Sequence, residues 1–142
     1  MEDLQRAKAC LEEENRTCVL CKDQQFYKSD SRGVAPLLQW LDAGIDAAGF
    51  SAADRVVGKA TAFLYCLLGV RAVHARVMSK PAAQVLEKAG IAASWEDLTE
   101  GIQNRQKDGP CPMEAATRTI DNPRDALIAI RTTLERLRSN GK

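Results

Sequence analysis

Apolar residues gather most densely between Phe50 and Gly69, where they recur at spacings of three and four residues. This spacing predicts one broad apolar helix face, made by Val56, Val57, Ala60, Phe63, Leu64, Leu67 and Leu68. Ser51 is placed to cap the helix, and Asp54 falls in its first turn, where free N–H groups favour an acid. The sequence therefore predicts a central core helix from Ser51 to Gly69 whose first turn opens on solvent or on a site.

The segments on either side alternate between helical and extended patterns. Helices are predicted over about residues 2–14, 34–43, 82–89 and 112–118 and from 122 onward, with Leu127, Ile130, Leu134 and Leu137 of the last one facing inward. Strands are predicted over residues 17–22, 25–28, 70–78 and 91–94, the first two as an antiparallel hairpin. Residues 95–111 show no clear period. Because helices and strands alternate, we expect an α/β fold with helices on both faces of one sheet.

Length and charge narrow the class of protein. The chain has 142 residues, which fits a single domain over residues 1–142. It carries 20 Lys and Arg against 19 Asp and Glu, so it lacks the strongly basic balance of a nucleic-acid-binding protein. The longest apolar run, Ala60 to Val70, is too short to span a membrane, and the acidic start lacks a signal segment. We expect a cytoplasmic protein with neither nucleic acid nor membrane as a partner.

The cysteines and the one histidine argue against metal or disulfide chemistry. Five cysteines, an odd number without framework spacing, indicate free thiols. Cys18 and Cys21 form C-x-x-C, but within a predicted strand their side chains point to opposite faces. His74 lies in the strand predicted over 70–78, where we expect it to be hydrogen-bonded at a rim or interface.

Four segments of the sequence resemble segments of a known protein family. RGVAPLLQWLD, GFSAADRVVGKATAFLY, MSKPAAQVLE and NRQKDGPCPME resemble an uncharacterised prokaryotic domain-of-unknown-function family of the cytidine-deaminase-like fold superfamily, and the match covers almost the whole chain. The resemblance implies a three-layer α/β/α sandwich around a mixed sheet. The family brings no established reaction with it.

The zinc ligands of that superfamily are missing from the matching positions. Zinc deaminases use an H-x-E and a P-C-x-x-C, each at the start of a helix. In our alignment Ala52 stands for the histidine and Asp54 for the glutamate, while Ala82 and Val85 stand for the two cysteines. Apolar side chains offer no lone pair to a metal. The resemblance therefore implies the fold without metal, and no cofactor is expected.

Polar residues near the predicted helix starts are the candidate site, because in this superfamily those starts meet at the pocket. The candidate catalytic residues are Asp54, Lys59 and Cys111, the last placed before Pro112 at a helix start, where a thiolate is stabilised. The candidate ligand-binding residues are Arg32, Ser79, Lys80, Asn104, Arg105 and Glu114. Structural roles compete with these: Asp54 and Ser79 as helix caps, and Cys111 as a buried thiol beside a capping Glu114.

Two classes of function remain open at this stage. The first is a pocket that binds a nucleoside-like or nucleotide-like molecule. Such a pocket either binds the molecule only or also catalyses a metal-free reaction, in which Cys111 is the nucleophile and Asp54 or Lys59 transfers protons. The second is a regulatory or assembly scaffold that has lost deaminase chemistry, forming a homo-oligomer through the strand at 70–78 or the terminal helices. The sequence does not decide whether a reaction is catalysed.

Overall fold

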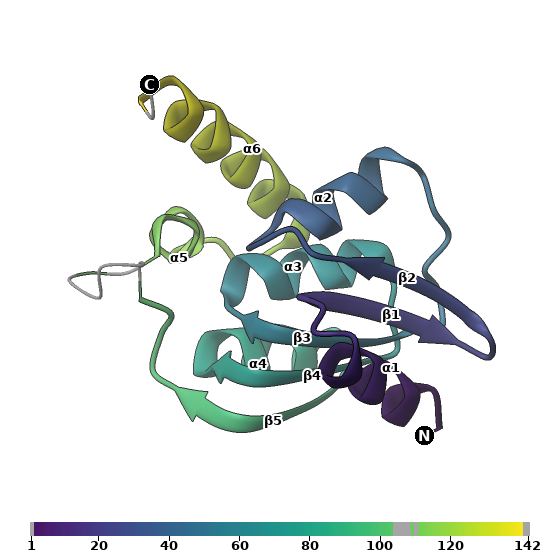
Figure 1. Cartoon of the computed structure of the whole chain (residues 1–142). Coiled ribbons are helices and arrows are strands. Elements are labelled where there is room, and N and C mark those ends of the chain that lie inside the picture. The colour runs from purple at the N-terminus through teal and green to yellow at the C-terminus, as the bar shows by residue number, and fades with distance from the viewer. Residues whose placement is uncertain (1, 104–108, 110, 141–142) are drawn as a thin grey trace.

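A five-stranded sheet in the order β2-β1-β3-β4-β5 forms the centre of the molecule (Figure 1). The computed structural model describes residues 2–103, 109 and 111–140. The strands are β1 (Cys18–Lys22), β2 (Gln25–Ser29), β3 (Ser51–Val57), β4 (Ala72–Ser79) and β5 (Ala92–Thr99). The helices are α1 (Glu2–Glu13), α2 (Ala35–Asp42), α3 (Lys59–Leu68), α4 (Lys80–Lys88), α5 (Pro112–Thr117) and α6 (Pro123–Asn140).

The sheet is mixed because two kinds of connection build it. β1 and β2 form the predicted antiparallel hairpin, in which Lys22 pairs with Gln25 across a two-residue turn. β3 runs antiparallel to β1 and parallel to β4, and β4 runs parallel to β5. The parallel pairs need crossovers, which α3 and α4 supply.

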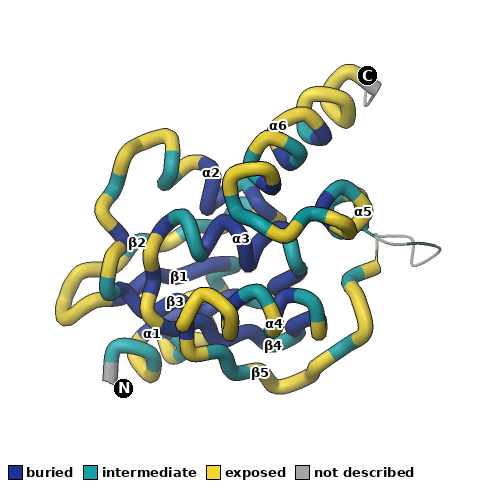
Figure 2. Tube along the Cα trace, turned by 180° about the vertical axis from the view of Figure 1, so that it is seen from behind, coloured by how far each residue is buried: buried dark blue, intermediate teal, exposed yellow. Residues whose placement is uncertain are grey.

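Helices cover both faces of the sheet, which confirms the predicted α/β class. On one face, Ala7 and Leu11 of α1 pack against Val19 of β1 and Ala53 of β3. On the other face, the larger core joins α3 and α4 to the sheet, with α2 and α6 packed outside α3. Strands β1, β3 and β4 are accordingly the most deeply buried, whereas the far end of α6 is exposed (Figure 2). None of the described helices is long and apolar enough to cross a membrane.

The central helix begins later than the sequence predicts. Residues Ser51–Val57 form β3 rather than the first turns of a helix, and α3 begins at Lys59 after Gly58. The prediction was wrong because β3 is buried on both faces between β1 and β4, so it lacks the alternation that identifies a strand. Ser51 is therefore not a helix cap.

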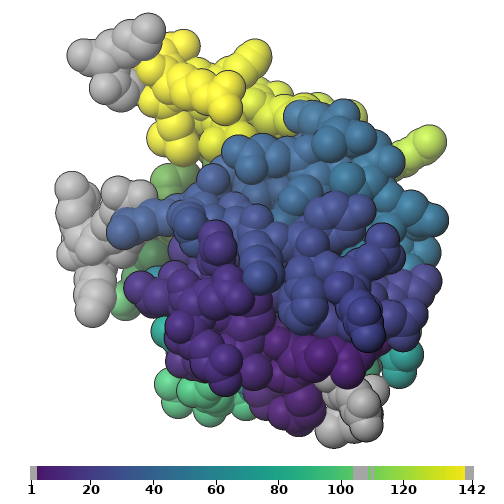
Figure 3. Space-filling view, turned by 45° about the vertical axis from the view of Figure 1, so that its right-hand side comes forward, coloured from purple at the N-terminus to yellow at the C-terminus, as the bar shows by residue number. Residues whose placement is uncertain are grey.

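Two further predictions are corrected at the edges of the fold. β5 extends to Thr99, beyond the predicted end at residue 94, because its pairing with β4 continues to Ser79 and Thr99. Leu137 was expected to face inward but is 40% exposed, since the end of α6 projects from the rest of the chain (Figure 3).

His74 is buried, and its Nδ1 lies 2.8 Å from Oγ of Ser94 on β5, as expected of a hydrogen-bonded histidine.

Candidate functional site

A cavity of about 280 Å³ opens beside the C-terminal half of β3, and we call it the Asp54 cavity. β1 and β3 form one side of it, the start of α2 with the turn before it another, and the starts of α3 and α5 the rest. The polar and small residues that the argument uses are Cys18, Arg32, Asp54, Gly58, Cys111 and Glu114. The chain thus brings four of the candidate site residues, Arg32, Asp54, Cys111 and Glu114, to one cavity.

Asp54 is the buried acid of this cavity. Its residue is only 7% exposed, because β3 places it between Cys18 of β1 and Ala75 of β4. Oδ1 accepts the backbone N–H of Arg55 at 2.8 Å, and Oδ2 accepts the hydroxyl of Tyr65 at 2.7 Å. No described residue forms an ion pair with this carboxylate.

Burial changes the ionisation of this group and of its neighbours. Removal from water raises the pKa of Asp54 to about 6, although hydrogen bonds led by that from Tyr65 act in the opposite direction. The Cys18 thiol lies 3.1 Å from the Tyr65 hydroxyl. Burial raises the pKa of both Cys18 and Tyr65 well above their ordinary values, so these two groups stay protonated near neutral pH. Asp54 is the member of this cluster that can change charge in that range.

Glu114 connects α5 to the start of α3. Its Oε1 accepts the backbone N–H of Lys59 at 2.6 Å, and its Oε2 accepts the backbone N–H of Ile102 at 3.2 Å. The first N–H groups of a helix have no carbonyl acceptor within the helix, and the Glu114 carboxylate supplies an acceptor for the first N–H of α3. The approach depends on Gly58, since a Cβ there would lie 2.6 Å from Oε1. Glu114 therefore caps α3 from another helix.

Cys111 and Arg32 lie at less enclosed parts of the same cavity. Cys111 immediately precedes α5 and is half-buried, and its N–H donates to the carbonyl of Ile102 at 2.8 Å. Arg32 lies exposed before α2 and has no ion pair with the part of the chain that the structure describes. A thiol and a guanidinium thus remain accessible around the buried acid.

Lys59, Ser79 and Lys80 lie outside the Asp54 cavity. The Lys59 Nζ donates to the carbonyl of Arg118 at 2.9 Å, outside the Asp54 cavity. Ser79 is fully buried and caps α4, its Oγ accepting the N–H of Ala82 at 3.2 Å. Lys80 forms an exposed ion pair with Glu100. Asn104 and Arg105 lie outside the described residues.

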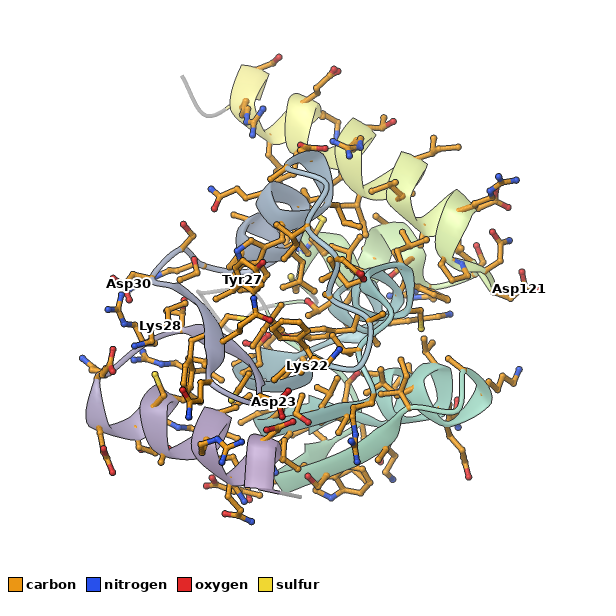
Figure 4. All side chains as sticks on the ribbon, turned by 90° about the vertical axis from the view of Figure 1, so that its right-hand side faces the viewer. Lys22, Asp23, Tyr27, Lys28, Asp30 and Asp121 are labelled. Carbon is orange, nitrogen blue, oxygen red and sulfur yellow. The ribbon has the colours of Figure 1, made fainter. Side chains whose placement is uncertain are left out.

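The starts of α3 and α4 line a second cavity, of about 370 Å³, through Lys59 and Pro81. Glu114 borders both this space and the Asp54 cavity. A third cavity, of about 270 Å³, lies between α3, α4 and the α5–α6 connection. That connection carries Asp121, on the opposite side of the molecule from Lys28 and Asp30 of the N-terminal region (Figure 4).

The alignment with zinc deaminases fails at its first position. Ala52 and Asp54 lie within β3, whereas the corresponding helix starts only at Lys59. Ala82 does lie in the first turn of α4, but it is buried and apolar. Over residues 2–103, 109 and 111–140, no three His, Cys, Asp or Glu side chains are grouped as metal ligands would be.

Sequence reasoning missed Tyr65, Cys18 and Gly58 as parts of the site. Tyr65 falls within the segment predicted as the apolar central helix and is not among the candidate residues, although a buried tyrosine hydroxyl requires a polar partner. That requirement was the available signal. The partners themselves come from segments 11 and 47 residues away along the chain, which no local pattern connects.

The comparisons with known proteins point to a family whose function is unknown. A family model described as TM1506, a domain of unknown function (DUF1893), matches residues 6–134. The crystal structure of a DUF1893 family protein (TM1506) from Thermotoga maritima is similar, with a TM-score of 0.84 and 22% sequence identity over 93% of this chain and 90% of that chain. This likeness shows the fold alone. Among curated proteins, none matches this chain.

Proposed function

Because this chain belongs to the DUF1893 family, whose description gives no activity, we propose a function from its own cavity: the Asp54 cavity binds a nucleoside-like or nucleotide-like small molecule. Asp54 is the main polar contact, accepting hydrogen bonds from N–H groups of the base. The deaminase-like resemblance supports this class of ligand, and the DUF1893 family itself gives no reaction.

One observation carries the proposal: a buried carboxylate without a cationic partner among the described residues faces an open cavity. Since burial raises the pKa of Asp54 only to about 6, the group is ionised at neutral pH. A buried charge without a compensating partner is costly. A ligand that donates hydrogen bonds to this carboxylate would compensate for that cost, which gives the cavity a preference for donor-rich molecules.

The remaining walls fit a small, partly apolar ligand. Val34, Val56, Ile102 and Met113 supply apolar surface around the single buried acid. Pockets for small molecules commonly have volumes of roughly 300 Å³ or more. The Asp54 cavity, of about 280 Å³, is close to the lower end of that range, so it suits a small molecule rather than a peptide chain. Arg32 at its rim is placed to contact a phosphate, as guanidinium groups commonly do.

The proposal concerns binding rather than a reaction. Cys111 shares the cavity with Asp54, but no histidine or lysine is among the described residues that line it. A thiol nucleophile is usually activated by such a neighbour. Ligand recognition by Asp54 therefore has more support than covalent chemistry at Cys111.

Calorimetric titration at about pH 8 with adenosine, cytidine, guanosine, uridine and their 5′-monophosphates tests this function. We expect one of these probes to bind, and Asp54→Asn to weaken that binding about 10- to 100-fold, because hydrogen bonds to a charged group are lost. Arg32→Ala should weaken the binding of a monophosphate more than that of its nucleoside.

Asp97→Asn is the matched control, since Asp97 is an exposed acid on β5, away from the Asp54 cavity. It should bind like the wild type. The proposal fails if no probe binds, or if Asp54→Asn binds as tightly as the Asp97→Asn control.

A further inference from the structure

Tyr65 is a buried tyrosine whose hydroxyl faces the site rather than solvent. It lies on α3, is fully buried, and does not itself line the Asp54 cavity. Its hydroxyl donates to Oδ2 of Asp54 at 2.7 Å and lies 3.1 Å from Sγ of Cys18. A buried hydroxyl aimed at the one buried carboxylate of the site acts through that carboxylate.

From this geometry we infer that Tyr65 is a positioning residue: its hydroxyl holds the Asp54 carboxylate charged and in one orientation, ready to receive a donor from the ligand. This inference rests on the proposed function for its consequence in binding. The contact between Tyr65 and Asp54 lies within the protein itself, so its effect on the carboxylate can be measured without any ligand.

The charge balance explains why such a contact matters. A hydrogen bond donated to a carboxylate favours the ionised form, whereas burial favours the neutral form. Burial raises the pKa of Asp54, and the hydrogen bond from Tyr65 is the largest of the contributions that lower it. The backbone N–H of Arg55 holds the other oxygen, so the two donors together fix the plane of the carboxyl group.

The surrounding titratable groups do not replace this role. The charged and titratable residues that face Asp54 from the packed elements, or share its cavity, are Cys18 on β1, Arg55 on β3, Tyr65 on α3, Arg32 before α2, and Cys111 and Glu114 around α5. The Arg55 guanidinium donates to the carbonyls of Arg16 and Asn15 and not to Asp54. Cys18 and Tyr65 remain protonated near neutral pH. Glu114 is bound to two backbone N–H groups, and Arg32 is at the rim. Of the two side chains that hydrogen-bond to Asp54, Tyr65 lowers its pKa more than the Cys18 thiol does. Removing the Tyr65 hydroxyl therefore takes away the stronger side-chain donor, the one bound to Oδ2.

The test compares Tyr65→Phe with Tyr27→Phe. Tyr27 is a suitable control because it is a partly buried tyrosine on β2 that packs against Trp40 and Phe50, outside the cavity (Figure 4). A carbon NMR titration of the aspartate carboxyls in the unliganded proteins should show the Asp54 midpoint moving up by about one pH unit or more in Tyr65→Phe, since a hydrogen bond to a charged group is lost. Tyr27→Phe should leave it unchanged.

The pH profile of binding gives the second measurement. For the nucleoside probe that binds the wild type, we expect Tyr65→Phe to move the midpoint of the binding profile upward by the same amount, with affinity largely recovered at about pH 9. A purely structural role would lower stability without moving either midpoint. The inference is overturned if the Asp54 midpoint does not move, or if it moves while the binding profile does not.

These outcomes separate the two proposals. If no nucleoside probe binds the wild type, the proposed function fails, and the NMR titration alone decides whether Tyr65 sets the charge of Asp54. If a probe binds and depends on Asp54 but neither midpoint responds to Tyr65→Phe, the proposed function stands and the role of Tyr65 is refuted.

Discussion

The Asp54 carboxyl carries a different charge in the folded and unfolded chain over part of the pH range. Burial raises the pKa of Asp54 to about 6 in the folded protein, from an ordinary value of 3.8. Between these values the folded form holds a proton that the unfolded form has lost, so the free energy of unfolding falls as pH rises. At neutral pH the charged carboxylate costs about 3 kcal/mol of stability, which is the linkage equivalent of this difference.

Asp54→Asn should remove that cost. Because the amide is uncharged, we expect the variant to be up to about 3 kcal/mol more stable than the wild type at about pH 8, and similar to it at about pH 4. Urea unfolding at the two pH values measures this difference. His74, whose pKa burial lowers, loses its contribution as pH falls in both proteins, so the comparison isolates Asp54.

Asp97→Asn again serves as the exposed control and should show no such pH-dependent gain. A variant Asp54→Asn that is less stable than the wild type at both pH values would mean that Asp54 has a structural role. If Asp54→Asn instead gains stability and loses binding, Asp54 is retained for binding at the cost of stability.

Asp54 also illustrates what the sequence could and could not predict at this scale. An acid beside an apolar run marked it as a candidate, together with Cys111, Glu114 and Arg32, and all four border one cavity. The reason given for Asp54 was wrong, because it lies in a strand and not at a helix start. Its hydrogen bond from Tyr65 depends on how β3 and α3 fold together, which residue types alone do not specify.

At the scale of the elements, the junction between α3 and α5 depends on one close approach. Glu114 reaches the first N–H of α3 only because Gly58 has no side chain. The backbone of Gly58 is extended there, with φ −96°, a conformation that any residue can adopt. The glycine is therefore needed for space and not for conformational freedom.

Gly58→Ala should destabilise the protein by about 1–3 kcal/mol, because the new Cβ displaces Glu114 and leaves the N–H of Lys59 without its partner. In a Glu114→Ala background the same change should cost less, since no carboxylate is left to displace and only the close contact with Cγ1 of Ile102, 3.0 Å from the new Cβ, remains. A double-mutant cycle from denaturant unfolding measures this coupling. Equal costs in the two backgrounds would refute the dependence of Glu114 on Gly58.

The elements themselves were predictable to different degrees. α1, the hairpin, α2 and α4 followed from local apolar spacing and turn residues, and their bounds agree closely with the structure. β3 was missed and β5 shortened, because parallel strands obtain their pairing from distant segments rather than from their own pattern.

On the scale of the whole molecule, the fold determines which thiols solvent can reach. Cys10, Cys18 and Cys21 are buried, whereas Cys111 and Cys66 are half-buried and border different cavities. All five are free. Cys111 can therefore report on the Asp54 cavity, while Cys66 reports on the separate cavity between α3 and α4.

The α/β class and the helices on both faces were predictable because the alternation of elements constrains the architecture. The cavities were not, since their walls come from segments far apart in the sequence: β1, β3, α2, α3 and α5 for the Asp54 cavity. The similarity to the DUF1893 family protein from Thermotoga maritima supports the same fold.

The most direct test of the central claim, that the Asp54 cavity holds a nucleoside-like ligand, is the alkylation rate of Cys111, followed by mass spectrometry at about pH 8 with and without the nucleosides and monophosphates. We predict that a binding probe slows alkylation of Cys111 at least about tenfold in the wild type, leaves Cys66 unaffected, and has little effect in Asp54→Asn. Alkylation of Cys111 at the same rate with every probe at saturating concentration would contradict the account.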